Sequence, residues 1–444
     1  MTNKPFSTRL ISLLVVVLIG FLIRLYFTRF GNFGDIVVFA EWGRRFWDLD
    51  LKEFYFDKNW YYSFPTYPPA SILLYAGLYW LYDKRFVLAE IHNAVKIIPA
   101  SFIIYFSEPV PKDPFLYGFG YFLLLKLPSI LADLGIGLLI YKIVFDITKS
   151  INRAFLGLIS FIFNPITIFI SSVWGQNDSL VSFFGLFAFI LLIYKKVWLS
   201  IPLLFISLYL KPNWIIFIPV YVLLVYLIKP NYRQLFYGIV LSILVYFITT
   251  LPFSRGNIFV FTKEIVLSNI LPSAKGVGKA SVDAFNFYAL FYKIDSTPAS
   301  SKLVGVPLSF FGILAYLVFV FQSFKNIVKT KTKELYFSII LSLYLMGMGI
   351  FIFSTGMLER YFFPALAPLI IIMFTKKPTL LPGILLQVVL FLNLIFAFYR
   401  RSSGTIDHIF TDGNMLLIKI LSLLNILLFL RIYMLQLKAW RRMN

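Results

Sequence analysis

The chain of 444 residues contains no cysteine and only two histidines, His92 and His408. Without cysteine there is no disulfide framework, no thiolate metal site and no thiol nucleophile. Two histidines argue against a histidine-rich metal centre. We therefore expect no metal and no cofactor, while dependence on a divalent cation stays open.

Charge is also scarce. Only 14% of the residues are charged, about half of the roughly 25% found in soluble domains. Hydrophobic residues make up 60% of the chain, and the mean hydropathy is +0.84. This composition excludes an ordinary soluble globule and a disordered chain, and it indicates an integral membrane protein whose main solvent is lipid.

Nucleotide-binding motifs are absent as well. The sequence has neither the phosphate-binding pattern G-x-x-x-x-G-K-[ST] nor a G-x-G-x-x-G pattern after a strand. An ATP-driven pump and a transferase that uses a soluble nucleotide donor are therefore disfavoured.

Long apolar runs dominate what is present, and several approach the length of about 20 residues that a spanning helix needs. We predict an all-α fold, a polytopic transmembrane helix bundle of about 12–14 spans. The first run follows Lys4 and Arg9 without a cleavage pattern, which predicts an uncleaved signal anchor. The runs at 86–106 and 197–210 are the least secure. The runs lie near 10–27, 68–82, 86–106, 115–141, 154–172, 179–194, 197–210, 213–228, 234–251, 303–324, 335–353, 361–375, 379–398 and 414–437.

The chain has 41 basic and 20 acidic residues, a net charge of +21, and the distribution of these charges predicts how the chain is oriented in the membrane. Basic residues mark cytoplasmic ends, and a cytoplasmic N-terminus puts 20 of the 41 on the inside if every run crosses. Both termini are then cytoplasmic. Fifteen of the 20 acids, and the long polar loops 29–67 and 252–302, fall outside. The net charge is thus a topology signal rather than a nucleic-acid site, and any chemistry is expected on the outer face.

The first outer loop begins with Gly31 to Asp35 and continues as an amphipathic pattern, which predicts a helix along the membrane surface. Asp35 is either an N-cap or a functional carboxylate, and the two readings are compatible. Eight aromatic residues between Phe54 and Tyr67 favour an interfacial belt over a sugar-stacking surface. The apolar face comprises Ile36, Phe39, Ala40, Gly43, Phe46 and Trp47, and the polar face Glu41, Arg44, Arg45 and Asp48.

Short polar turns fall on the same predicted face. We interpret them as ligand-binding candidates, with N-capping as the alternative for Asp178. The few basic residues on short outer loops, chiefly Arg360 and Lys211 with Arg400 or Arg401, are expected to bind an anionic group. The candidates are Trp174, Gln176 and Asp178, then Lys211, then Glu359 and Arg360, together with Asp283 in the second long loop.

Four stretches together resemble one family, the polytopic GT-C glycosyltransferases, in particular the bacterial and archaeal group related to the GPI-anchor mannosyltransferases. One departure is that related sequences commonly have His before the E-R-Y triplet, where this chain has Leu358; the role of that His is lost or supplied elsewhere, for example by His408. The stretches are Ile23-Arg24 to Trp42, Tyr67-Pro68-Pro69, Trp174-Gly175-Gln176-Asn177-Asp178 and Glu359-Arg360-Tyr361-Phe362-Phe363-Pro364, supported by Lys126-Leu-Pro128 with Asp133, Asn164-Pro165, Leu210-Lys211-Pro212 and Ala284-Phe285-Asn286.

The resemblance implies one glycosyltransferase domain over 1–444, a polyprenyl- or dolichyl-phosphate sugar donor, an inverting transfer and an extracytoplasmic active site. It implies mannose or another hexose, and a glycan, lipid or protein acceptor. It also implies an acidic residue of the first outer loop near the reacting hydroxyl, a position that Asp35 matches. We expect Asp35 to act as the general base.

Two alternatives remain. A secondary transporter or a lipid or oligosaccharide flippase would show paired broken helices and ionisable groups near the membrane midplane, whereas here the ionisable groups gather at the outer ends. An O-antigen-ligase-like enzyme would use the same class of donor.

Overall fold

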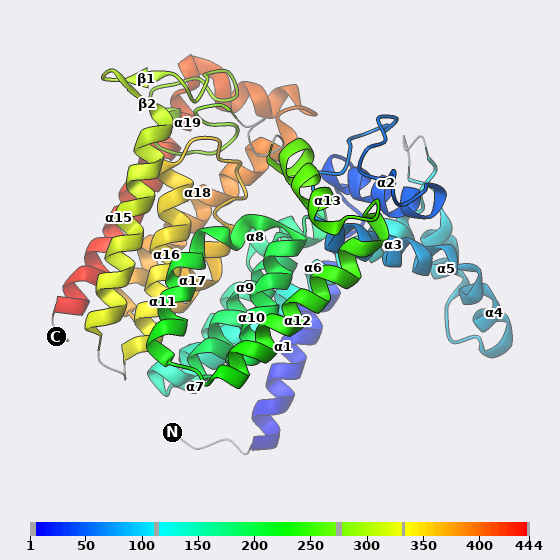
Figure 1. The fold of residues 1–444 in the computed structure, drawn as a ribbon, viewed down its shortest axis with the longest axis horizontal. Coiled ribbons are helices and arrows are strands. Elements are labelled where there is room, and N and C mark those ends of the chain that lie inside the picture. Colours follow the sequence, from blue (N-terminus) through cyan, green and yellow to red (C-terminus); the bar gives the residue numbers. More distant parts are fainter. Residues whose placement is uncertain (1–5, 111–114, 272–277, 331–333, 442–444) are drawn as a thin grey trace.

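The computed structural model describes residues 6–110, 115–271, 278–330 and 334–441. Over these residues it is all-α apart from one short antiparallel hairpin, in which β1 (Lys302–Leu303) pairs with β2 (Val306–Pro307). The long helices run side by side, and the first begins near the end of the bundle where the last one finishes (Figure 1). We call the opposite end, which carries α2 and the β-hairpin, the outer end.

Eight helices are long and apolar enough to cross a membrane, so the protein is a multi-pass membrane protein. Four shorter apolar helices run along the same bundle, which makes twelve passes within the described ranges. The long passes are α1 (Phe6–Phe27), α6 (Phe119–Thr148), α7 (Ile151–Ile162) continued by α8 (Pro165–Ile168) and the π-helix η1 (Phe169–Trp174), α12 (Tyr232–Thr250), α15 (Leu308–Lys329), α16 (Leu335–Phe353), α18 (Leu380–Tyr399) and α19 (Gly404–Arg441); the shorter ones are α9 (Asp178–Ile193), α10 (Val197–Leu210), η2 (Pro212–Phe217) with α11 (Ile218–Ile228), and α17 (Phe363–Thr375).

Burial separates the centre of the bundle from its rim. In α16, 83% of the apolar window is buried by protein, against 11% in α1 and 17% in α12. A helix that is apolar on all sides and buried occupies the core, whereas one that is apolar but exposed faces lipid. The core therefore lies around α16 and its neighbour α17, and α1 and α12 present most of their surface to lipid.

The predicted span 68–82 is wrong. Its helix, α3 (Pro69–Asp83), has both ends at the outer end of the bundle. Near its start, Ser71 Oγ donates to the carbonyl of Leu210 at the end of α10, and near its finish the hydroxyl of Tyr82 accepts from the backbone N–H of Gly118 just before α6. The helix thus lies across the bundle end. An apolar run of 15 residues has the same composition whether it crosses the core or covers its end.

The predicted span 86–106 is also wrong. Lys96 adopts a left-handed conformation (φ 55°) and Pro99 follows it, so the run divides into α4 (Phe86–Val95) and α5 (Ala100–Ser107). Ten residues make a helix of about 15 Å, half of the hydrocarbon thickness. Because two neighbouring spans are lost together, the direction of every later pass is unchanged. Lys84 and Arg85, expected on the inside, therefore lie at the outer end. By contrast, 197–210 forms one continuous helix, α10.

The predicted surface helix exists as α2 (Asp35–Asp48), which lies beside α3 at the outer end (Figure 1). Its polar face is not the expected one, because Glu41 is buried and its carboxylate accepts the backbone N–H groups of Tyr61 at 2.7 Å and Tyr62 at 2.9 Å. The loop after α2 folds back over this face. The expected aromatic belt is therefore partly a core, since Phe54 and Tyr55 are buried.

Candidate functional site

Four segments that are far apart in the sequence meet at the outer end of the bundle. Asp35 begins α2, Gln176 lies in the turn between η1 and α9, and Asp178 begins α9. Lys211 follows α10, and Arg360 lies between α16 and α17. Their side chains form one connected polar group, which we call the outer network. The network brings together the acidic and basic residues that the sequence placed on one face.

The π-helix η1 aims Gln176 at Asp35. Gly175 ends η1 with a φ of 76°, and a Cβ at this position would lie 2.6 Å from Cδ1 of Ile36, so the turn needs glycine for both its conformation and its space. Beyond Gly175, Nε2 of Gln176 donates a short hydrogen bond to Oδ2 of Asp35. The carboxylate of Asp35 is thereby held on one oxygen.

Arg360 lies among three carboxylates. Its Nη1 is 2.5 Å from Oε1 of Glu359, its Nη2 is 3.2 Å from Oδ2 of Asp35, and its Nε is 3.9 Å from Oδ2 of Asp178. Burial alone would lower the pKa of Arg360, but these carboxylates, with Glu359 first, raise that pKa well above its ordinary value. The guanidinium stays charged and is already neutralised by protein groups. The presence of a basic residue on an outer loop is therefore explained by these carboxylates as well as by an expected anionic ligand.

The aromatic ring of Trp174 supports the same guanidinium, whose Cζ lies 5.2 Å from the ring centroid. Such cation–π contacts stabilise a cation by about 0.5–2 kcal/mol. Trp174 is buried, so its ring backs Arg360 rather than offering an open face to a sugar.

Lys211 and Asp178 form a second buried pair. Nζ of Lys211 lies 3.1 and 3.0 Å from the two carboxylate oxygens of Asp178, and Nδ2 of Asn213 donates to the same carboxylate at 2.8 Å. The capping alternative for Asp178 is wrong, because the cap position of α9 is Asn177. It is wrong for Asp35 too, because Gly34 occupies the cap position of α2. Both carboxylates are committed to side chains from other segments.

Exposure singles out Asp35. Its side chain is 41% exposed, against 11% for Arg360 and 1% for Asp178. The outer network is therefore closed on the protein side and open at one carboxylate. A reacting molecule can approach Asp35 while the groups behind it stay fixed.

Asp283 belongs to a neighbouring cluster. Its carboxylate lies 2.7 Å from Nη2 of Arg400, and the same Nη2 lies 2.8 Å from Asp295. Burial, followed by the negative charge of Glu359, raises the pKa of Asp283 to about 7, although Arg400 opposes the shift. Arg401 is largely exposed, with its Nη2 3.7 Å from Asp295. Asp283 and Arg400 thus lie beside the outer network, and Glu359 stands between the two clusters.

His408 does not replace the histidine expected at Leu358. It lies in the first part of α19, is 75% exposed, and its Nδ1 is 2.6 Å from a carboxylate oxygen of Asp412. This surface pair is separate from the buried groups that surround Arg360.

Sequence reasoning assigned no role to Lys126, a fully buried residue of α6. Its Nζ donates to the carbonyls of Thr28 and Phe30 and to Oδ1 of Asn32, at 2.8–2.9 Å. Lys126 thus ties α6 to the turn that leads into Asp35. A lysine inside an apolar span is the signal that could have identified it, because ionisable groups in spans are costly and functional.

Two acceptors in the turn after η1 have no hydrogen-bond partner within the described part of the chain: Oε1 of Gln176 and Oδ1 of Asn177, both buried. Buried acceptors without partners are costly, so a donor from a bound molecule or water suits them. The described residues contain no group of three His, Asp or Glu side chains placed to hold a metal ion.

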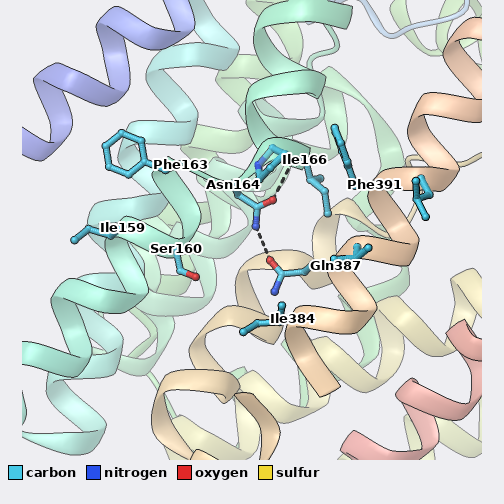
Figure 2. Close-up of a pocket in the computed structure, with 11 residues that line it drawn as sticks. Ile159, Ser160, Phe163, Asn164, Ile166, Ile384, Gln387 and Phe391 are labelled. Atoms are coloured by element: carbon cyan, nitrogen blue, oxygen red, sulfur yellow. Dashed lines mark hydrogen bonds between the residues drawn. The ribbon is translucent and has the colours of Figure 1, made fainter. Parts of the chain in front are cut away.

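A separate lateral cavity of about 400 Å³ lies between α7, α8 and α18. Figure 2 shows that Asn164 and Gln387 meet across it, with Nδ2 of Asn164 donating to Oε1 of Gln387 at 2.5 Å, while most of the other lining side chains are apolar. None of the outer-network residues lines this cavity.

No protein-family model matches the chain, and no curated protein matches it either. The likeness to GT-C enzymes therefore rests on the motifs alone. Fold and composition establish a polytopic α-helical membrane protein with a charged network at one end of its bundle.

Proposed function

We propose that the protein is an inverting glycosyltransferase that moves a hexose, such as mannose, from a polyprenyl- or dolichyl-phosphate donor to an extracytoplasmic glycan, lipid or protein acceptor. The observation that carries this proposal is the half-exposed carboxylate of Asp35, which Gln176 and Arg360 hold at the outer end of a membrane bundle. A lipid-linked donor is confined to the bilayer, so its enzyme needs a site at the membrane boundary. The absence of nucleotide motifs from the sequence agrees with such a donor.

The chemistry is a single displacement. The acceptor oxygen forms a bond to the anomeric carbon while the bond from that carbon to the phosphate oxygen breaks with inversion. Asp35 takes the proton of the acceptor hydroxyl, and the bonding electrons leave with the lipid phosphate. General-base assistance of this kind contributes about 10²–10⁴-fold to a rate.

Arg360 links the donor site to the base. Its guanidinium lies 3.2 Å from the carboxylate of Asp35. A donor phosphate competes for the same guanidinium, since arginine binds phosphate oxygens well. As Arg360 turns to the phosphate, the carboxylate of Asp35 is released to meet the acceptor hydroxyl. The Lys211–Asp178 pair lies on the other side of Arg360, where Asp178 is 3.9 Å from its Nε.

The test is transfer by the purified protein in lipid nanodiscs, with synthetic polyprenyl-phosphate hexoses and no nucleotide. Release of polyprenyl phosphate that depends on an added glycan or lipid acceptor supports the proposal. Lys142→Met, a change in a surface ion pair, is the matched control and should transfer normally. Failure of the wild type to cleave any donor in the panel, with the fold intact, would remove the proposal.

Orientation has its own test, because the chain contains no cysteine. A single cysteine at Asn59 or Gly256, both at the outer end, should react with an impermeant thiol reagent in intact cells. A cysteine at Lys196 should react only after lysis. The reverse pattern would place the outer network in the cytoplasm and exclude an extracytoplasmic acceptor.

One observation favours the alternative of a transporter or flippase. Arg24, Lys126 and Asp133 are fully buried within helices that cross the bundle, and ionisable groups in such places often mark transport pathways. A flippase would carry a fluorescent lipid-linked sugar across a vesicle membrane and leave it intact. Recovery of the intact lipid-linked sugar from the opposite leaflet would favour this alternative over the transferase.

A further inference from the structure

The helices α4 and α5 form an arm that extends sideways from the outer end of the bundle (Figure 1). Only its base is packed: Phe106 at the end of α5 is buried, and Leu88 packs against the same core. No residue of α4 is buried by protein. The arm therefore leaves apolar surface uncovered by the described part of the chain.

The exposed surface has two faces. On a helix, the positions of Val87, Ile91 and Val95 recur at intervals of four residues and share one side, and all three side chains are exposed. Asn93 lies on the opposite side of α4, Glu90 and His92 flank the apolar side, and Lys96 follows the helix at its C-terminal end. The tip adds Ile97, which is 77% exposed. This amphipathic pattern is typical of a helix in the plane of a membrane interface.

Length and charge point to the same partner. Helices of ten and eight residues are too short to cross the hydrocarbon core, which is about 30 Å thick. Lys84 and Arg85 flank the base of α4 and Lys96 ends it, which suits the anionic headgroups of phospholipids.

We propose that the arm, residues 84–107, is an interfacial anchor that rests in the headgroup layer of the outer leaflet and binds anionic phospholipid. Its apolar face contacts acyl chains instead of other protein side chains, and its basic residues contact lipid phosphates. This inference does not depend on the proposed transferase activity.

The experiment uses an Ile97→Cys variant of the full chain, labelled with an environment-sensitive fluorophore and reconstituted into vesicles of phosphatidylcholine with or without phosphatidylglycerol. We expect a blue-shifted emission. Quenching by a spin label near the lipid headgroup should exceed that by a label near the chain end by about two-fold or more, because interfacial helices lie at the boundary between headgroups and acyl chains. Phosphatidylglycerol should increase the shift.

Two variants complete the test. A cysteine at Lys58, an exposed residue of the first outer loop, is the aqueous control. Lys96→Gln in the labelled protein should remove much of the response to phosphatidylglycerol and retain the quenching by shallow labels. Aqueous emission from position 97 would overturn the proposal, and so would dominant quenching from the chain end. Cross-linking of position 97 between two copies at high dilution in lipid would overturn it as well, in favour of a protein partner.

Discussion

Two charged networks in the same bundle have opposite relations to solvent. Deep between α1, α6 and α8, Arg24 pairs with Asp133 at 3.1 Å, and both side chains are 0% exposed. The remaining donors of Arg24 bind the carbonyls of Gly20 and Ile162 and the hydroxyl of Thr167. The outer network contains the same residue types, but Asp35 opens it to solvent. A closed network holds helices together, and an open one can exchange a proton or a partner.

The largest effect is expected from Asp35→Asn. The change keeps the shape and removes the base, so transfer should fall by about 10²–10⁴-fold. Because Gly34 occupies the cap position, helix stability should be nearly unchanged. The measurement is turnover of a polyprenyl-phosphate hexose by the folded variant. Near-normal turnover would mean that the open carboxylate has no part in the chemistry and would leave Asp178 or Asp283 as the base.

The closed network should show its effect in stability. Asp133→Leu leaves Arg24 buried without its counter-ion, and breaking such a pair costs about 3–5 kcal/mol. The measurement is the free energy of unfolding in mixed detergent micelles. The double variant Arg24→Met with Asp133→Leu should recover much of the loss, because the orphaned charge is gone. A double variant as unstable as the single one would contradict the role of the pair as a structural tie.

Lys126→Met should have a smaller effect, which reaches the outer network. The variant keeps the length of the side chain but leaves the carbonyls of Thr28 and Phe30 without their donor, at a cost of about 1–3 kcal/mol. The turn before Asp35 should then move. Cysteines introduced at Asp35 and Gln176 in the same protein should be linked less efficiently by a short bifunctional thiol reagent. Unchanged linking would show that Lys126 contributes to stability only.

The pH dependence of stability should show the raised pKa of Asp283. Its pKa of about 7 in the folded protein exceeds the ordinary value of 3.8, so the folded state keeps a proton that the unfolded state releases. Stability should therefore fall as the pH rises between these two values. Asp283→Asn should remove this contribution from the pH profile of thermal unfolding. Equal slopes in the two proteins would mean that Asp283 is charged over the whole range.

The smallest effect is expected from Lys142→Met. Lys142 pairs with Asp146 at 2.6 Å, but its side chain is 52% exposed. Exposed pairs contribute about 0–1 kcal/mol, so unfolding should shift little and transfer should be unchanged. A loss comparable to that of Asp133→Leu would show that burial does not separate the two kinds of pair.

Most of the fold could be predicted because lipid imposes one rule on every pass, an apolar helix with its backbone groups satisfied internally. The rule does not say whether an apolar helix crosses the core or lies across its end. The predicted span 68–82 is wrong for this reason, since α3 meets the rest of the chain through Ser71 and Tyr82 at one end of the bundle. In 86–106, Lys96 and Pro99 are visible in the sequence, but these two residues alone do not show whether the apolar run continues as one span or divides into two short helices.

The location of the candidate site was also predictable, because basic residues mark inner ends and leave Asp35, Asp178 and Arg360 at outer ones. Their partners were not. Periodicity assigned Glu41 to a polar surface, and only the folded loop brings the N–H groups of Tyr61 and Tyr62 to its carboxylate. Contacts across more than a hundred residues depend on how helices pack, which helical periodicity does not encode.

In the π-helix η1, the number of residues matters more for the position of Gln176 than the identity of most of its side chains. The N–H of Gln176 reaches back to the carbonyl of Ile170, so the segment holds more residues than a regular helical turn would. Losing one residue here would restore ordinary helix geometry and rotate everything that follows by about 100°. Gln176 would then point away from Asp35. Over evolutionary time, substitutions within η1 should therefore accumulate more readily than deletions, because a single lost codon would separate the two halves of the outer network.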